Sequence, residues 1–104
     1  MTGDLAKLQS RLERISRQYE AEFGIEPGND WVLFKLQEEL GELTQAYLAV
    51  TQRSRHRLDG ADGHAALARE LADVLGFALV LAERLGIDAE AALKAKWLKY
   101  EATP

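Results

Sequence analysis

Apolar residues recur every three or four positions along most of the chain, the spacing that gathers side chains on one face of an α-helix. This pattern predicts four helices, at about residues 4–23, 30–53, 64–85 and from Asp88 to about 101. No segment alternates polar and apolar residues for long enough to be a convincing strand. The expected fold is therefore all-α, a four-helix bundle-like module.

The breaks between these helices contain the residues that commonly end or begin them. Gly24 and the Pro27-Gly28 turn should end the first helix, with Asn29 or Asp30 capping the second. Gly86 should end the third helix before Asp88 caps the fourth. A polar segment at residues 54–63 separates the two central helices.

The two central helices should bury their leucine-rich stripes. The expected core positions are Leu36, Leu40, Leu43, Tyr47 and Val50 on the second helix, and Leu67, Leu71, Val74, Ala78, Leu81 and Leu85 on the third. Phe34, Phe77 and Val80 fall outside these stripes. They predict a second apolar face and therefore an oligomer.

Length and composition limit the possible functions. A chain of 104 residues is expected to form one domain, residues 1–104. Its net charge of −4 argues against binding nucleic acid through a general electrostatic field. With no cysteine, any metal site must use oxygen or imidazole ligands. The most apolar window, residues 71–82, is shorter than the roughly 18 residues that a membrane span needs, and the first residues lack signal-peptide features. We expect a cytoplasmic protein without a membrane partner.

Each central helix carries a pair of acidic residues spaced by three. Glu39 and Glu42 lie in the second helix, and Glu70 and Asp73 lie 31 positions further on, in the third. If these helices pack antiparallel, the four carboxylates meet at one edge of the core, where they would repel one another. A divalent cation relieves that repulsion, and hard oxygen ligands favour Mg²⁺, with Mn²⁺ as a substitute. Glu38 lies about 100° around the helix from Glu39, so it is better placed to support the ligands from behind, to bind a further cation or to hold a water than to be a ligand of the first ion.

A simpler interpretation of the acids stays open at this point. They could form a solvated helix face with pairs such as Lys35 and Glu39. His56 and His64 flank the polar segment and are expected to be surface residues rather than ligands. The arginines of this segment could contact phosphates or could only keep the loop soluble; they are Arg53, Arg55 and Arg57.

The acidic motifs resemble those of a known enzyme family. Residues 35–43, KLQEELGEL, and residues 70–75, ELADVL, resemble the EExxE and ExxD signature of the MazG-like, all-α nucleoside triphosphate pyrophosphohydrolases. The run AERLGID at residues 82–88, with the lysine-bearing last helix, is also similar to that family. The resemblance covers about residues 30–100.

This resemblance implies a Mg²⁺-dependent enzyme that cleaves nucleotides between the α and β phosphates, giving a nucleoside monophosphate and pyrophosphate. By motif position, the metal ligands would be Glu39, Glu42, Glu70 and Asp73, and Glu38 would assist the attacking water. Family members form homodimers or dimers of dimers, with sites near subunit interfaces. The substrate expected here is a nucleotide triphosphate.

Cations must also balance the substrate's charge, because both the protein and its acidic cluster repel a triphosphate. On the fourth helix Lys96 and Lys99 share one side and are the first candidates for phosphate contacts, with Lys35 as a further one. Many relatives end this helix with Lys and Arg together, a pattern this chain lacks. Trp31, at the start of the second helix, is a candidate for stacking on the base.

Three hypotheses about function follow. The first is a pyrophosphohydrolase that removes unwanted or non-standard nucleotides. The second is a phosphoribosyl-ATP pyrophosphatase of histidine synthesis, whose related fold uses similar acids. The third is a non-enzymatic helical interaction module, in which the acids form a polar face and take up no metal.

Overall fold

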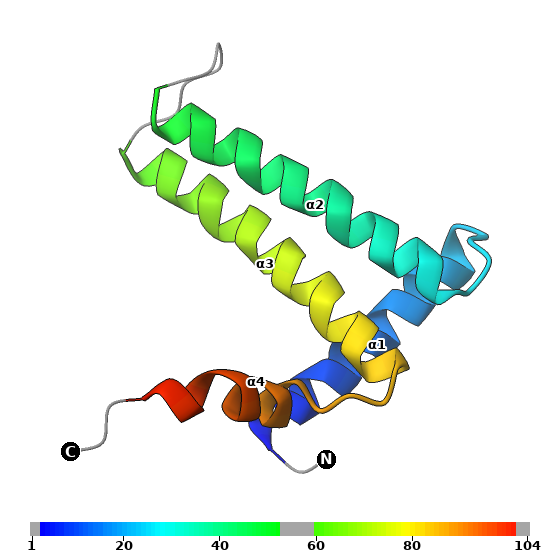
Figure 1. Ribbon diagram of the computed structural model, residues 1–104. Coiled ribbons are helices and arrows are strands. Elements are labelled where there is room, and N and C mark those ends of the chain that lie inside the picture. Colours follow the sequence, from blue (N-terminus) through cyan, green and yellow to red (C-terminus); the bar gives the residue numbers. More distant parts are fainter. Residues whose placement is uncertain (1–2, 53–59, 102–104) are drawn as a thin grey trace. The chain divides into compact units, whose positions relative to one another are not determined.

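The computed structural model describes residues 3–52 and 60–101. Within these ranges the chain forms α1 (Asp4–Glu22), α2 (Asn29–Val50), α3 (Gly60–Arg84), α4 (Ala89–Trp97) and the short 3₁₀ helix η1 (Leu98–Tyr100), as Figure 1 shows. No strand occurs in either range. The all-α prediction is confirmed, although α3 begins four residues before its expected start, within the predicted polar break, and the last helix ends in η1.

The glycines predicted to end the first and third helices stand at the ends of α1 and α3. Gly24 and Gly86 adopt φ values of 66° and 69°, in the left-handed region that glycine enters without strain. Behind Gly86, the Ile87 amide donates to the Ala82 carbonyl at 2.8 Å, which closes the end of α3. The prediction that Asn29 or Asp30 caps α2 is wrong, because the chain enters this helix at Gly28 without a side-chain cap.

The described residues divide into two compact units. One unit combines α1 with the last turns of α3 and with α4, and the other combines α2 with α3 up to residue 78. The second unit is called the hairpin below, because its helices run side by side and antiparallel (Figure 1). Each unit has its own set of buried residues.

The face of α2 that packs on α3 includes an acidic residue. Val32, Glu39 and Ala49 are the buried residues of α2, and their spacing of seven and ten positions places them on one side of the helix. On α3, Ala66 is buried, while Leu67 and Val74 are half-buried. The contact between the helices is therefore apolar along most of its length, with the Glu39 carboxyl inside it.

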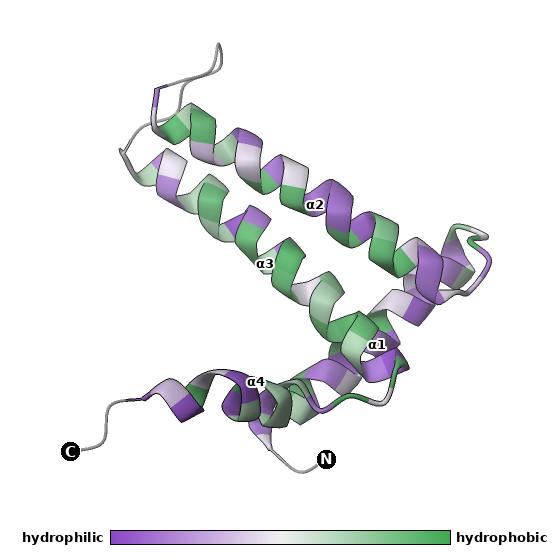
Figure 2. Cartoon of the chain, viewed as in Figure 1, coloured by the Kyte–Doolittle hydropathy of each residue, from purple (hydrophilic) through white to green (hydrophobic). Residues whose placement is uncertain are grey.

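Two leucines and a tyrosine expected in the core lie outside this contact. Leu40, Tyr47 and Leu71 are 54%, 51% and 47% exposed, so the prediction that they are core residues is wrong for the single chain. A leucine stripe wider than one neighbouring helix can cover leaves one flank in solvent. Figure 2 shows the resulting mixture of apolar and polar positions along both helices of the hairpin.

The three apolar residues predicted to form a second face have different environments. Phe34 is 62% exposed, as expected. Phe77 is half-buried and meets the Trp31 ring edge-on, with 6.1 Å between ring centroids. Val80 is 4% exposed and belongs to the core of the other unit. The prediction is wrong for Val80, which is buried within the chain, whereas for the half-buried Phe77 it stays a prediction.

The unit that contains α1 is held by polar contacts as well as apolar ones. Arg84, in the last turn of α3, donates to the carboxylates of Glu13 and Glu20 and to the Ser16 hydroxyl. Only 3% of the Arg84 side chain and 2% of the Glu20 side chain are exposed. A buried guanidinium with two carboxylate partners is strongly destabilised when either partner is lost.

A second polar contact joins α1 to the turn between α3 and α4. The side-chain amide of Gln9, which has no exposed surface, donates to the Ile87 carbonyl at 3.0 Å and to Glu83 at 3.2 Å. Its carbonyl oxygen accepts from the Ala89 amide at 2.8 Å. At the start of α4, Asp88 accepts from the Ala91 amide, which confirms the predicted cap.

Candidate metal centre

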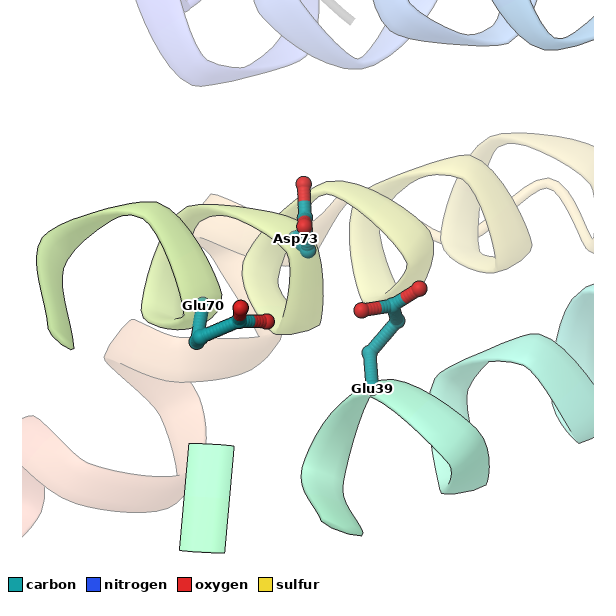
Figure 3. A group of neighbouring side chains, drawn as sticks. All are labelled: Glu39, Glu70 and Asp73. Carbon is teal, nitrogen blue, oxygen red and sulfur yellow. The ribbon is translucent and has the colours of Figure 1, made fainter. Parts of the chain in front are cut away.

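Three carboxylates converge inside the hairpin. Glu39 reaches from α2 toward α3, which supplies Glu70 and Asp73 (Figure 3). One oxygen of each residue lies within 4.8 Å of the others. Residues spaced by three lie on adjacent turns of one helix face, so Glu70 and Asp73 lie on the same side of α3. The predicted meeting of acidic pairs across antiparallel helices is confirmed for these three residues.

Burial of the cluster is graded from the helix contact outward. Glu39 is 7% exposed, Glu70 is half-buried and Asp73 is exposed. The Oε2 atoms of Glu39 and Glu70 are buried and have no hydrogen-bond partner. A buried carboxylate oxygen without a partner is costly, and a metal ligand is one of the few roles that explains it.

The electrostatics of the cluster oppose full ionisation. Burial, together with a side-chain hydrogen bond to Glu42 and the charges of Glu42 and Asp73, raises the pKa of Glu39 from 4.5 to about 7. Lys35 acts in the opposite direction, because its charge favours the ionised form. Without a cation, the site therefore retains a proton into the neutral pH range.

These residues fit a hard divalent cation. The donors are carboxylate oxygens from two rigid helices, two of them lack partners, and one side of the cluster is open to solvent at Asp73. Such oxygen-rich sites suit Mg²⁺ or Mn²⁺, which keep part of their water shell, rather than zinc with its nitrogen and sulfur ligands.

Glu42 and Glu38 lie beside this cluster rather than within it. Glu42 is exposed and interacts with Glu39, but it is not among the three residues whose oxygens converge. Glu38 accepts from the Lys35 ammonium at 3.0 Å, with its side chain 55% exposed. Their roles as metal ligand and as catalytic group stay predictions.

Two aromatic residues line the hairpin near Lys35. Trp31 is half-buried against Phe77, and the Lys35 ammonium lies 5.9 Å from the centroid of the Phe77 ring. Sequence reasoning assigned Phe77 to an oligomer face and missed this contact. The signal was available, since Phe77 falls one helical turn after Asp73 and Val74.

The remaining predicted site residues belong elsewhere. Lys96 in α4 and Lys99 in η1 are exposed and lie in the unit that contains α1, so their part in phosphate binding stays a prediction. His64 is exposed on the first turns of α3. The positions outside the described residues are Arg53, Arg55, His56 and Arg57.

The sequence of the chain matches the model of a known protein family. The family model for phosphoribosyl-ATP pyrophosphohydrolase matches residues 5–95, most of the chain. No curated protein and no solved structure matches it. None of the helices in the described ranges has the length and apolar content of a membrane span.

The matched segment contains both acidic motifs and the whole hairpin. Enzymes of this superfamily depend on a metal ion, which agrees with the cluster of Glu39, Glu70 and Asp73. The chain therefore belongs to the phosphoribosyl-ATP pyrophosphohydrolase family, within the MazG-like all-α nucleoside triphosphate pyrophosphatase superfamily.

Proposed function

We propose that this pyrophosphohydrolase uses Mg²⁺ to hydrolyse the α–β anhydride bond of nucleoside or deoxynucleoside triphosphates. One water is consumed, and the products are a nucleoside monophosphate and pyrophosphate. The observation that supports this most is the convergence of Glu39, Glu70 and Asp73 within 4.8 Å, with two buried carboxylate oxygens left without partners. Mn²⁺ should be able to replace Mg²⁺.

The residues of the hairpin would divide the work of binding and proton transfer. Glu39, Glu70 and Asp73, joined by Glu42, would hold the metal. When bound, the ion supplies charge neutralisation for the phosphates and acidifies water. Glu38 would accept the proton of the attacking water, because its carboxylate is largely exposed and lies one residue from Glu39.

Substrate binding would add positive charge and a stacking surface. Lys96 and Lys99 are proposed to contact the β and γ phosphates, with Lys35 as a further contact. Trp31 is proposed to stack on the base, because it is half-buried and held edge-on by Phe77.

Phosphoribosyl-ATP is the second candidate substrate, favoured by the matching family model. It keeps the triphosphate of ATP, so the same cleavage applies, but it carries an additional ribose phosphate on its base. Removal of unwanted or non-standard nucleotides requires activity on free triphosphates. A panel that contains phosphoribosyl-ATP, canonical triphosphates and modified triphosphates therefore separates the two roles.

The decisive experiment measures pyrophosphate release by the purified chain with Mg²⁺. We expect Glu39→Gln and Asp73→Asn to lower the rate at least about a hundredfold, since each removes charge from the metal site. Asp62→Asn is the matched control, an exposed acid in the first turn of the same α3 helix. Undiminished hydrolysis in excess EDTA, or equal activity of all three variants, would refute the proposal.

We also propose that the chain acts as a homodimer or as a dimer of dimers. Leu40 precedes Glu42 by two residues, and Leu71 precedes Asp73 by two residues. Two residues correspond to about 160° around a helix, so each leucine lies nearly opposite that acid. Leu33, Tyr47 and Leu75 are also between 43% and 54% exposed. A second copy of the chain would cover these five residues, while the acids would remain accessible.

Light scattering after size-exclusion chromatography tests the assembly. The wild type should elute as an oligomer, and Leu40→Asp should shift it to a monomer because the new carboxylate would be buried in the interface. A wild type that is a stable monomer at micromolar concentration would refute the assembly and leave the metal site unaffected.

A further inference from the structure

Lys35 is bound to the acidic cluster that the metal would enter. Its ammonium nitrogen lies 3.0 Å from Glu38 Oε2 and 3.8 Å from Glu39 Oε1. Both acids follow it by one helical turn, so the contacts are local to α2. The Lys35 side chain is 28% exposed, which makes it a partly enclosed cation rather than a freely solvated one.

An aromatic surface supports this position. The ammonium lies 5.9 Å from the centroid of the Phe77 ring, within the range of a cation–π contact. Phe77 is in turn held edge-on by Trp31. The lysine therefore has stabilising neighbours from both α2 and α3, and its long stem can move among them without unfolding the helix.

The same Glu39 carboxyl belongs to the group whose oxygens converge with those of Glu70 and Asp73. A divalent ion held there would share the Glu39 carboxylate with the ammonium, and two positive charges at one carboxylate repel. Lys35 neutralises part of the carboxylate charge that would otherwise attract the ion. Binding of one cation must weaken binding of the other.

We propose that Lys35 is the built-in counter-cation of the metal-free site, and that a divalent cation entering the cluster displaces its ammonium from Glu39. The displaced ammonium remains within reach of Glu38, and it becomes available to the phosphates of a substrate. Lys35 is in this view a positioning residue that lowers metal affinity and keeps the empty site folded. The inference rests on the proposed metal site.

Metal titration of the intact chain tests this displacement directly. Mn²⁺ binding is measured by isothermal titration for the wild type, Lys35→Met and Lys35→Gln. Both substitutions keep a flexible side chain of similar length and remove the charge. We expect Mn²⁺ to bind about three- to tenfold more tightly to both, and the gain should shrink at high ionic strength. Melting in EDTA should occur at a lower temperature than for the wild type.

Two control variants separate charge from a general effect of substitution. Lys35→Arg keeps the charge and should bind Mn²⁺ within about twofold of the wild type. Lys94→Met removes a lysine that makes the same kind of pair, with Glu90 at 3.0 Å, on an exposed part of α4. It should leave Mn²⁺ affinity unchanged.

The outcomes distinguish this inference from the proposed function. Equal or weaker Mn²⁺ binding by Lys35→Met and Lys35→Gln, with normal binding by the wild type, overturns the role of Lys35 alone. No Mn²⁺ binding by the wild type, or binding that survives Glu39→Gln and Asp73→Asn, overturns both the metal site and the inference.

Discussion

The metal-free protein should lose stability as the pH rises from about 4.5 to about 7, because of Glu39. Burial, the hydrogen bond to Glu42 and the charges of Glu42 and Asp73 raise the pKa of Glu39 in the folded chain from 4.5 to about 7. The folded state therefore keeps this proton after the unfolded state has released it. The free energy of unfolding falls as the pH passes from about 4.5 to about 7, and it is level above that range.

The size of this loss follows from the two pKa values. A pKa of about 7 in place of 4.5 corresponds to at most about 3 kcal/mol. Asp73 opens the cluster to solvent, so screening should reduce the observed loss to about 1–2 kcal/mol. Glu39→Gln removes the titrating group while keeping the size of the side chain, so its stability should lack this part of the pH dependence.

Urea unfolding in EDTA, at several pH values between about 5 and about 8, measures the effect. The difference between the wild type and Glu39→Gln isolates the contribution of Glu39 from that of other titrating groups. The variant should be the more stable protein at about pH 8, and saturating Mg²⁺ should reverse that order. Parallel pH profiles for the two proteins would refute the electrostatic account of the cluster.

Two further predictions concern the unit that contains α1 and α4. Arg84→Met should lower the free energy of unfolding by about 3–5 kcal/mol in urea titrations, because Glu20 would be left buried without its cation. Arg17→Met, which removes the partly exposed pair with Glu13, should cost less than about 1 kcal/mol, and equal losses would contradict this account. Asp88→Ala should lower the free energy of unfolding by about 1 kcal/mol, because the start of α4 loses the cap to the Ala91 amide and frays. Faster amide hydrogen exchange at the start of α4 would show this, whereas unchanged exchange would show that the cap is dispensable.

The acidic cluster could be predicted from sequence because its geometry is mostly local. A spacing of three places Glu70 beside Asp73 on any regular helix, and the same spacing recurs at Glu39 and Glu42. Antiparallel packing of neighbouring helices then brings the two sides together. What spacing did not reveal is that Glu39 lies inside the helix contact while Glu42 stays exposed.

The leucine pattern was less informative about packing. Leu36 and Leu43 are half-buried, whereas Leu40 and Tyr47 lie on the exposed flank of the same stripe. The sequence pattern of one helix indicates that a face is apolar. It does not indicate which part of that face packs against a neighbouring helix, because this depends on the neighbour's shape. Phe77 shows the same limit, because its burial depends on Trp31 from another helix.

Gln9 joins two parts of the chain through a side chain that does not ionise at any accessible pH. Its neutral amide donates and accepts at the same time, and it joins α1 to the turn that leads into α4. A carboxylate of equal length would lack the donor, and a lysine would lack the acceptor. The two bonds that Gln9 makes to the backbone of Ile87 and Ala89 should therefore be insensitive to acidity, whereas the metal-binding hairpin responds to it.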